Sequence, residues 1–174
     1  MLLTGALGVG KTTVLIETIE ALKAQGVSVG GMISCEAREG GTRVGFEITN
    51  LTNNEHGWLA HVNQKSGPKV GKYRVNLHDL DSIGAKAIVE AVEKYAVVAI
   101  DEVGPMELLS QGFRQAVRQA FDSGKLVFAV VHAKAEDPLI NEAKQREDAE
   151  ISTVTLANRD GLPEKLKKQA LSVL

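Results

Sequence analysis

Five short segments rich in apolar residues are spaced along the chain. Segments of four to eight residues with many β-branched side chains are typical of buried strands. The segment at 97–100 is apolar throughout, as expected for a central strand of a parallel sheet. The predicted strands are residues 1–4, 27–34, 97–100, 126–131 and 151–156.

Between these segments, apolar residues recur every three or four positions, the spacing that gives a helix one buried face. The pattern is continuous from Leu80 to Tyr95. A helix over 13–25 ends at Gly26, a residue type that commonly follows a helix. Three further helices are predicted: one with Phe113, Ala116, Val117, Ala120 and Phe121 on one face, one that Asp137 and Pro138 begin, and one that Pro163 begins.

Residues 43–52 follow a different pattern, in which Val44, Phe46 and Ile48 alternate with polar positions. This alternation predicts a half-exposed strand, and the Gly40-Gly41 pair before it predicts a turn. Another short strand is predicted at 58–62. Three successive strands with no helix between them indicate an antiparallel meander added to an otherwise alternating chain.

The alternation of strands and helices predicts an α/β fold, a three-layer sandwich of a mostly parallel sheet with helices on both faces and the added antiparallel meander. In such a sheet the ligand binds at the carboxyl ends of the strands. The length of 174 residues suits a single domain over residues 1–174.

Composition narrows the classes of partner. The 20 basic and 22 acidic residues are balanced, so nothing indicates a nucleic-acid or membrane-surface partner. Cys35 is the only cysteine, which excludes a disulfide framework and a thiolate metal site. No apolar run approaches 18 residues and no signal segment is present, so we expect a cytoplasmic protein.

The first predicted strand and helix are joined by a complete phosphate-binding loop (P-loop, Walker A) of the pattern GxxxxGK[ST]. It reads Gly5-Ala6-Leu7-Gly8-Val9-Gly10-Lys11-Thr12 and continues into Thr13. Glycines let the backbone N–H groups approach a triphosphate, and the positive end of the helix favours its charge. Lys11 is expected to reach the β- and γ-phosphates, and the Thr12 hydroxyl to bind Mg²⁺. The sequence therefore predicts a nucleotide-binding protein.

Two acids follow the apolar segment 97–100 and resemble a Walker B motif. In P-loop enzymes a carboxylate at the end of a neighbouring strand holds the Mg²⁺, and Asp101 is placed for that role. Glu102 is placed to orient and deprotonate a water molecule in line with the γ-phosphorus. These residues favour hydrolysis of the triphosphate.

Three other functions use the same loop. Residues 101–104 fit the DxxG pattern of GTP switches, but 133–136 read Ala-Lys-Ala-Glu where guanine recognition requires Asn-Lys-x-Asp. A nucleotide or small-molecule kinase needs several arginines around its two substrates. Residues 132–148 offer only Lys134, Lys144 and Arg146. Hydrolysis is favoured, and a kinase remains the main alternative beside a slow nucleotide switch.

The chain closely resembles the Thep-type nucleoside-triphosphatases over essentially all 174 residues. The resemblance rests on the P-loop through Thr13, on Arg43-Val44-Gly45-Phe46, on residues 70–75, on Ile100-Asp101-Glu102-Val103-Gly104-Pro105-Met106-Glu107-Leu108, and on Asn158-Arg159-Asp160. It implies Mg²⁺-dependent hydrolysis of ATP, GTP, CTP and UTP with little selection between bases. It also implies an extra central strand in the sheet and a catalytic glutamate.

Some residues have more than one interpretation. Arg159 follows the last strand, where its guanidinium can stack on the nucleotide base or form an exposed ion pair. His132 can contact the γ-phosphate or lie in a surface loop. Arg43, Arg114 and Arg118 are candidates to stabilise the transition state. His56, His61 and His78 share no metal-ligand spacing.

Overall fold

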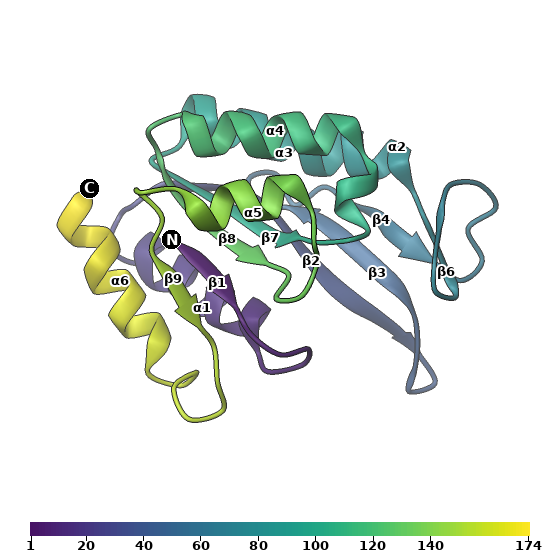
Figure 1. The fold of residues 1–174 in the computed structure, drawn as a ribbon, viewed down its shortest axis with the longest axis horizontal. Helices are drawn as coiled ribbons and strands as arrows, with labels where there is room; N and C mark the ends of the chain where they lie inside the picture. The colour runs from purple at the N-terminus through teal and green to yellow at the C-terminus, as the bar shows by residue number, and fades with distance from the viewer.

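A computed structural model describes all of residues 1–174 and contains one nine-stranded sheet (Figure 1). The strands lie in the order β5-β6-β4-β3-β2-β7-β8-β1-β9. Their bounds are β1 Leu2–Thr4, β2 Val29–Glu39, β3 Thr42–Asn50, β4 His56–His61, β5 Lys69–Val70, β6 Tyr73–Val75, β7 Val97–Val103, β8 Leu126–Val131 and β9 Ile151–Thr153. The helices are α1 Lys11–Lys23, α2 Leu77–Asp79, the π-helix η1 Leu80–Ala85, α3 Lys86–Lys94, the 3₁₀-helix η2 Glu107–Leu109, α4 Gln111–Asp122, α5 Pro138–Gln145 and α6 Leu162–Val173.

The strands β2, β7, β8, β1 and β9 are parallel neighbours, which confirms the predicted parallel sheet. Strand β8 lies between β1 and β7, the strand that carries Asp101. This is the extra central strand that the family resemblance implies. The predicted bounds differ most at β2, which continues past Ser34 to Glu39; β9 ends early, at Thr153, and β7 continues past Ile100 to Val103.

The antiparallel meander is confirmed, and it is larger than predicted. Strand β2 pairs with β7 over its first four residues and with β3 from Met32 to its end. Strands β4, β6 and β5 continue the antiparallel pairing outward. The sequence pattern did not reveal β5 and β6, because strands of two and three residues have no measurable alternation. In Figure 1 the meander extends away from β9 and α6.

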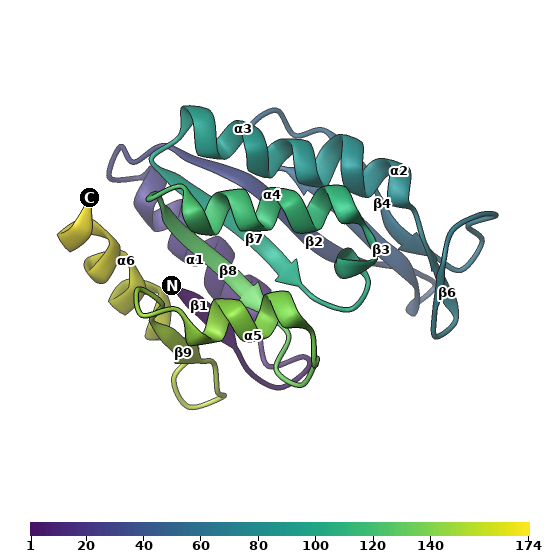
Figure 2. The ribbon, with the colours of Figure 1, turned by 45° about the horizontal axis from the view of Figure 1, so that its top comes forward.

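Helices cover both faces of the sheet, and the predicted three-layer arrangement is confirmed. Helices α3, α4 and α5 lie over one face, and α1 and α6 over the other (Figures 1 and 2). Residues of β7 divide between the two layers. Val98 and Ile100 belong to the core under α3, α4 and α5, whereas Val97 and Ala99 belong to the core under α1 and α6.

The predicted helix over 80–95 is not an α-helix throughout. Its first part is the π-helix η1, which follows α2 and leads into α3. In η1, Asp81 accepts a hydrogen bond from the Ser110 hydroxyl, which also caps α4 by accepting one from the amide of Phe113. The apolar spacing does not reveal this wider turn, because Leu80, Ile83 and their neighbours remain buried on one side.

Asp137 begins α5 and joins it to α4, so its removal tests the packing of this layer. Its carboxylate accepts a hydrogen bond from the Leu139 amide at 2.9 Å and two from Arg114 at 3.1 and 2.6 Å. The side chains of Arg114 and Asp137 are only 20% and 16% exposed. We expect Asp137→Ala to lower the free energy of unfolding by about 2 kcal/mol, measured by urea denaturation at pH 7.

Asp122→Ala is the matched control. Asp122 also binds an arginine, Arg146, at 2.8 Å, but its side chain is 72% exposed, so we expect a change within about 0.5 kcal/mol. The hydrogen bond from Arg114 lowers the pKa of Asp137. The contribution of Asp137 is therefore present above the unfolded pKa of about 3.9 and is lost as the pH falls through the lowered folded value. Equal destabilisation by both substitutions at pH 7 would contradict this assignment.

Candidate active site

The loop between β1 and α1 is built around glycines whose backbone angles would strain any other residue. Gly5 and Gly10 have φ angles of 146° and 106°, which L side chains rarely adopt. A Cβ atom on Gly5 would also lie 2.6 Å from the Val154 carbonyl oxygen, so the loop fits closely against the segment after β9. No side chain caps α1 at Gly10, which leaves the first N–H groups of the helix free for an anion.

Lys11 is the first residue of α1 and lies back over this loop. Its Nζ atom donates hydrogen bonds to the carbonyl oxygens of Gly5 at 3.3 Å and Ala6 at 3.2 Å. These are the only partners of the ammonium group, and one of the two hydrogen bonds is exposed to solvent. The lysine is therefore free to exchange the loop carbonyls for a phosphate.

Asp101 lies in β7, inside the strand and not after it as predicted. The pairing of β7 with β8 shifts between Ile100 and Val103, so the two acids occupy an irregular part of the strand. Asp101 is 2% exposed, and its Oδ2 atom has no hydrogen-bond partner. Burial raises the pKa of Asp101 to about 7; the Thr12 hydroxyl and Lys11 act against this rise, and Glu102 adds to it.

An unpaired oxygen of a buried carboxyl group is unusual, because burial without a partner has a large free-energy cost. The neighbouring Thr12 hydroxyl adds a second oxygen at the same place. Oxygen atoms of this kind are the ligands that Mg²⁺ prefers. Thr12 and Asp101 therefore fit a magnesium ion, whereas no cluster of three or more His, Cys, Asp or Glu side chains is arranged to hold a metal.

Glu102 is accompanied by a second glutamate, Glu107, to which the sequence analysis gave no role. Glu107 is 3% exposed and begins η2. Burial raises its pKa to about 8, and the charges of Glu102 and Asp101 add to the rise. The signal in the sequence was an acid between the apolar residues Met106 and Leu108, in the stretch most characteristic of the family resemblance.

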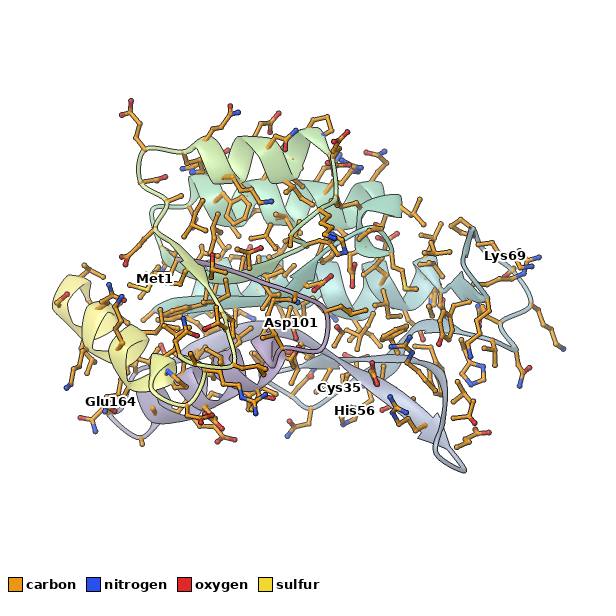
Figure 3. The ribbon with its side chains drawn as sticks, turned by 60° about the horizontal axis from the view of Figure 1, so that its bottom comes forward. Met1, Cys35, His56, Lys69, Asp101 and Glu164 are labelled. Carbon is orange, nitrogen blue, oxygen red and sulfur yellow. The ribbon has the colours of Figure 1, made fainter.

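These side chains line one cleft of about 440 Å³. Figure 3 shows Asp101 near the middle of the molecule, beside the loop after β1, with Cys35 of β2 nearby. One side of the cleft consists of Leu7, Gly8, Gly10, Lys11, Thr12, Asp101, Glu102, Glu107 and His132. The meander side consists of Ser34, Cys35, Glu36, Phe46, Leu59 and Val70. The predicted phosphate, metal and base-catalysis residues thus lie together, and their roles stay predictions.

Arg159 lies outside this cleft, at a neighbouring hollow of about 300 Å³ on the other side of Gly10. The hollow is lined by Gly10, Thr13, Val14, Glu17, Arg159 and Asp160. Arg159 donates a hydrogen bond to the Val9 carbonyl at 3.5 Å and lies 3.6 Å from the Asp160 carboxylate. The ion pair agrees with one interpretation of Arg159, and stacking on the nucleotide base stays a prediction.

The other candidate site residues differ in their ion-pair and hydrogen-bond partners and in whether they line the cleft. Arg114 and Arg118 form ion pairs with Asp137 and Glu142, and neither lines the cleft. Arg43 binds Glu36, which does line it. His132 lines the cleft, and its Nδ1 atom accepts hydrogen bonds from two amides of its own loop.

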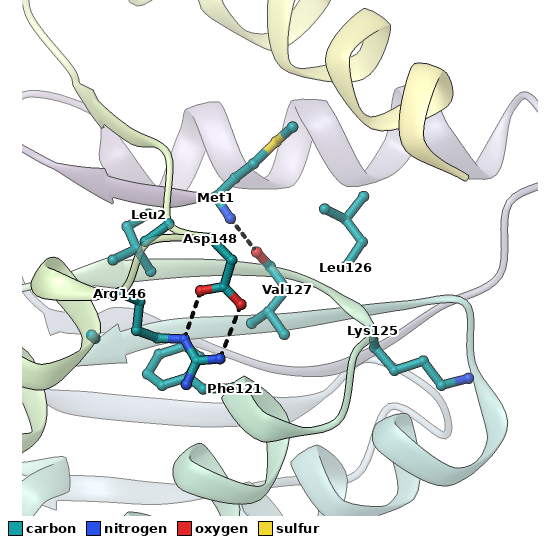
Figure 4. Close-up of a pocket in the computed structure, with 10 residues that line it drawn as sticks. Met1, Leu2, Phe121, Lys125, Leu126, Val127, Arg146 and Asp148 are labelled. Carbon is teal, nitrogen blue, oxygen red and sulfur yellow. Dashed lines mark hydrogen bonds and ion pairs between the residues drawn. The ribbon is translucent and has the colours of Figure 1, made fainter.

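A smaller hollow of about 100 Å³ lies at the opposite, amino ends of β1 and β8 (Figure 4). Its main polar groups are already satisfied: Arg146 binds Asp148 and Asp122, and the Met1 amino group donates to the Val127 carbonyl. None of the helices is both long enough and apolar enough to cross a membrane.

The chain has clear relatives. A protein-family model described as NTPase matches residues 1–167. The chain is similar to nucleoside-triphosphatase THEP1 of Thermofilum pendens, with 45% identity over 174 residues that cover 99% of this chain and 96% of the relative. It is also 45% identical over 172 residues to the protein of that name from Methanosarcina acetivorans, covering 98% and 96% of the two chains.

Two solved structures have the same fold. The crystal structure of THEP1 from Aquifex aeolicus matches with a TM-score of 0.84 at 28% identity, over 98% of both chains. The solution structure of a human cancer-related nucleoside triphosphatase matches with a TM-score of 0.83 at 32% identity, over 100% of this chain and 98% of the other. These similarities extend over the cleft and the meander alike.

Proposed function

Because this chain belongs to the THEP1 family of nucleoside-triphosphatases, we propose that it hydrolyses the γ-phosphate of nucleoside triphosphates with Mg²⁺ and with little selection between bases. The triphosphatase activity follows from relatives that match nearly the whole chain. The metal, the attacked phosphorus and the range of bases are the parts that this proposal adds.

The observation that carries the proposal is the unpaired Oδ2 atom of buried Asp101 beside Thr12 and Lys11, in one cleft. Thr12 and Asp101 would hold Mg²⁺, and the amides of residues 8–13 with Lys11 would bind the triphosphate. When bound there, Mg²⁺ neutralises charge on the phosphate oxygens. Mg²⁺ would also replace the missing partner of the Asp101 carboxylate.

Glu102 would act as the general base. It lines the same cleft as Lys11 and is less buried than Asp101, so its carboxylate can reach water. In the proposed step the water oxygen forms a bond to the γ-phosphorus while the bond to the bridging β-γ oxygen breaks. The water proton passes to Glu102, and the nucleoside diphosphate leaves with the bridging oxygen.

Weak selection between bases is supported by the hollow at Arg159, where we propose that the base lies. Strong discrimination requires buried hydrogen-bonding groups matched to one base. The polar side chains there, Thr13, Glu17, Arg159 and Asp160, are all exposed. An exposed guanidinium stacks on any base with similar strength.

The kinase alternative has less support. Its candidate cations are engaged elsewhere: Lys144 donates to the carbonyl oxygens of His132 and Ala133, and Arg146 binds two aspartates far from the cleft. Lys134 alone is exposed without an ion pair. Water is therefore the proposed acceptor.

We expect ATP, GTP, CTP and UTP to have kcat/KM values within about tenfold of each other, or about 1.4 kcal/mol. We also expect EDTA to abolish the activity, since Asp101 and Thr12 would lose their ion. Phosphate release with Mg²⁺ or EDTA measures both, with thin-layer separation to detect a phosphorylated acceptor. A thousandfold preference for GTP would favour a GTP switch, and a phosphorylated acceptor would favour a kinase.

A further inference from the structure

Glu107 lines the cleft of the proposed reaction, but the proposed reaction gives it no role. Glu107 begins η2, four residues after the end of β7. The backbone around it is fixed by hydrogen bonds from the Leu108 amide to the Gly104 carbonyl at 3.0 Å and from the Ser110 amide to the Glu107 carbonyl at 3.1 Å. The side chain is 3% exposed, so its carboxyl group occupies a defined place in the cleft wall.

The carboxyl groups of Glu102 and Glu107 both lie beside Gly104. A Cβ atom built on Gly104 would lie 2.7 Å from Glu102 Oε1 and 3.1 Å from Glu107 Oε2. Glu102 Oε1 and Glu107 Oε2 therefore both lie near the position that a Cβ atom of residue 104 would occupy, and this position is empty because the residue is glycine. A side chain at this position would crowd both carboxyl groups, so glycine leaves room for the pair.

The surroundings of Glu107 favour its uncharged form. No lysine, arginine or histidine forms an ion pair with it, although ten ion pairs occur elsewhere in the chain. Burial raises the pKa of Glu107 to about 8, and the charge of Glu102 adds to the rise, whereas the amides of Glu107 and Gly104 act against it. The net effect favours the protonated carboxyl group. An uncharged carboxyl group can donate a hydrogen bond to a neighbouring carboxylate.

We propose that Glu107 is a positioning residue, whose carboxyl group donates a hydrogen bond to the Glu102 carboxylate beside Gly104 and so holds it in the cleft. Glu107 neither touches the water nor gives up its proton. It fixes the direction from which Glu102 receives the water proton. This inference rests on the proposed role of Glu102 as the base.

A positioning role differs from a structural one in its effect on stability. A buried acid with no cation destabilises the fold relative to an apolar side chain of similar size. A group kept only for packing should therefore be replaceable by leucine with no loss of activity. A positioning group should instead lose activity while stability is kept or increased.

The experiment compares Glu107→Leu with Glu107→Gln in the full chain. We expect Glu107→Leu to lower kcat for MgATP about a hundredfold, the scale of a misplaced catalytic group, with KM and Tm unchanged or Tm raised. Glu107→Gln should stay within about tenfold of the wild-type kcat, because its amide keeps a donor toward Glu102. Glu142→Gln, at an exposed glutamate of α5, is the control for glutamate replacement.

Gly104→Ala tests the geometry without changing either acid. Its backbone accepts an L residue, but the new methyl group would enter the space between the two carboxyl groups. We expect a similar loss of kcat, and no further loss when Gly104→Ala is combined with Glu107→Leu.

The inference is overturned if Glu107→Leu keeps the wild-type kcat, or if the leucine and glutamine variants lose kcat equally. A fall of Tm together with kcat in Glu107→Leu would also overturn it, since packing would then explain the effect. The positioning role of Glu107 and the proposed role of Glu102 as base can fail independently of each other. If Glu102→Gln is inactive while Glu107→Leu is fully active, the base stands and the positioning role does not.

Discussion

Replacing Glu102 with glutamine is expected to slow the hydrolysis of MgATP at least about a hundredfold, while MgATP still binds. Glutamine keeps the size of the side chain and an oxygen that can hold the water, but it cannot take the proton. The loss corresponds to about 2.7 kcal/mol of activation free energy. Single-turnover hydrolysis measures the rate, and calorimetry measures the binding of MgATP.

Asp101→Asn is the informative comparison, because the two acids are adjacent but have different surroundings. Asp101 is 2% exposed with an unpaired oxygen beside Thr12, whereas Glu102 is partly open to the cleft. We expect the asparagine variant to lose Mg²⁺-dependent binding as well as turnover. If Glu102→Gln turned over at the wild-type rate and Asp101→Asn alone were inactive, Glu102 would not be the base.

Replacing Lys11 with alanine is expected to weaken the binding of MgATP at least about a hundredfold in Kd while the fold stays intact. In the protein without nucleotide, Nζ is bound only to the carbonyl oxygens of Gly5 and Ala6, so its removal opens no cavity. With nucleotide, the substitution removes a charge-assisted hydrogen bond to the phosphates. Calorimetry measures the affinity, and thermal unfolding checks the fold.

Lys23→Ala is the matched control at the other end of the same helix. Lys23 is exposed in the last turn of α1, away from the loop, and its removal should leave the affinity unchanged. Near-wild-type affinity in Lys11→Ala would exclude this loop as the triphosphate site.

The sequence predicted the parts of the site that depend on local chemistry. The P-loop and the two acids after the apolar segment 97–100 are recognisable because each is contiguous in sequence and adjoins or lies in a regular element. The rule that ligands bind at the carboxyl ends of parallel strands then brought Lys11 and Asp101 together, and the sheet order has β1 and β7 on either side of β8.

Other features depend on contacts that the sequence pattern does not encode. Glu107 is buried beside Gly104, whose carbonyl accepts a hydrogen bond from the Leu108 amide of η2, and the sequence alone does not reveal this contact. The π-helix η1 keeps the apolar spacing of an α-helix, and its Asp81 is satisfied by Ser110, 29 residues away. Arg114 was a candidate for the transition state, but its partner Asp137 holds it at α5.

The most direct test of the central claim is hydrolysis of MgATP in ¹⁸O-labelled water, followed by mass analysis of both products. Attack of water on the γ-phosphorus, with Glu102 as base, requires one ¹⁸O atom from the solvent in the inorganic phosphate and none in ADP. Label in ADP, or a γ-phosphate found on an acceptor other than water, would contradict the account.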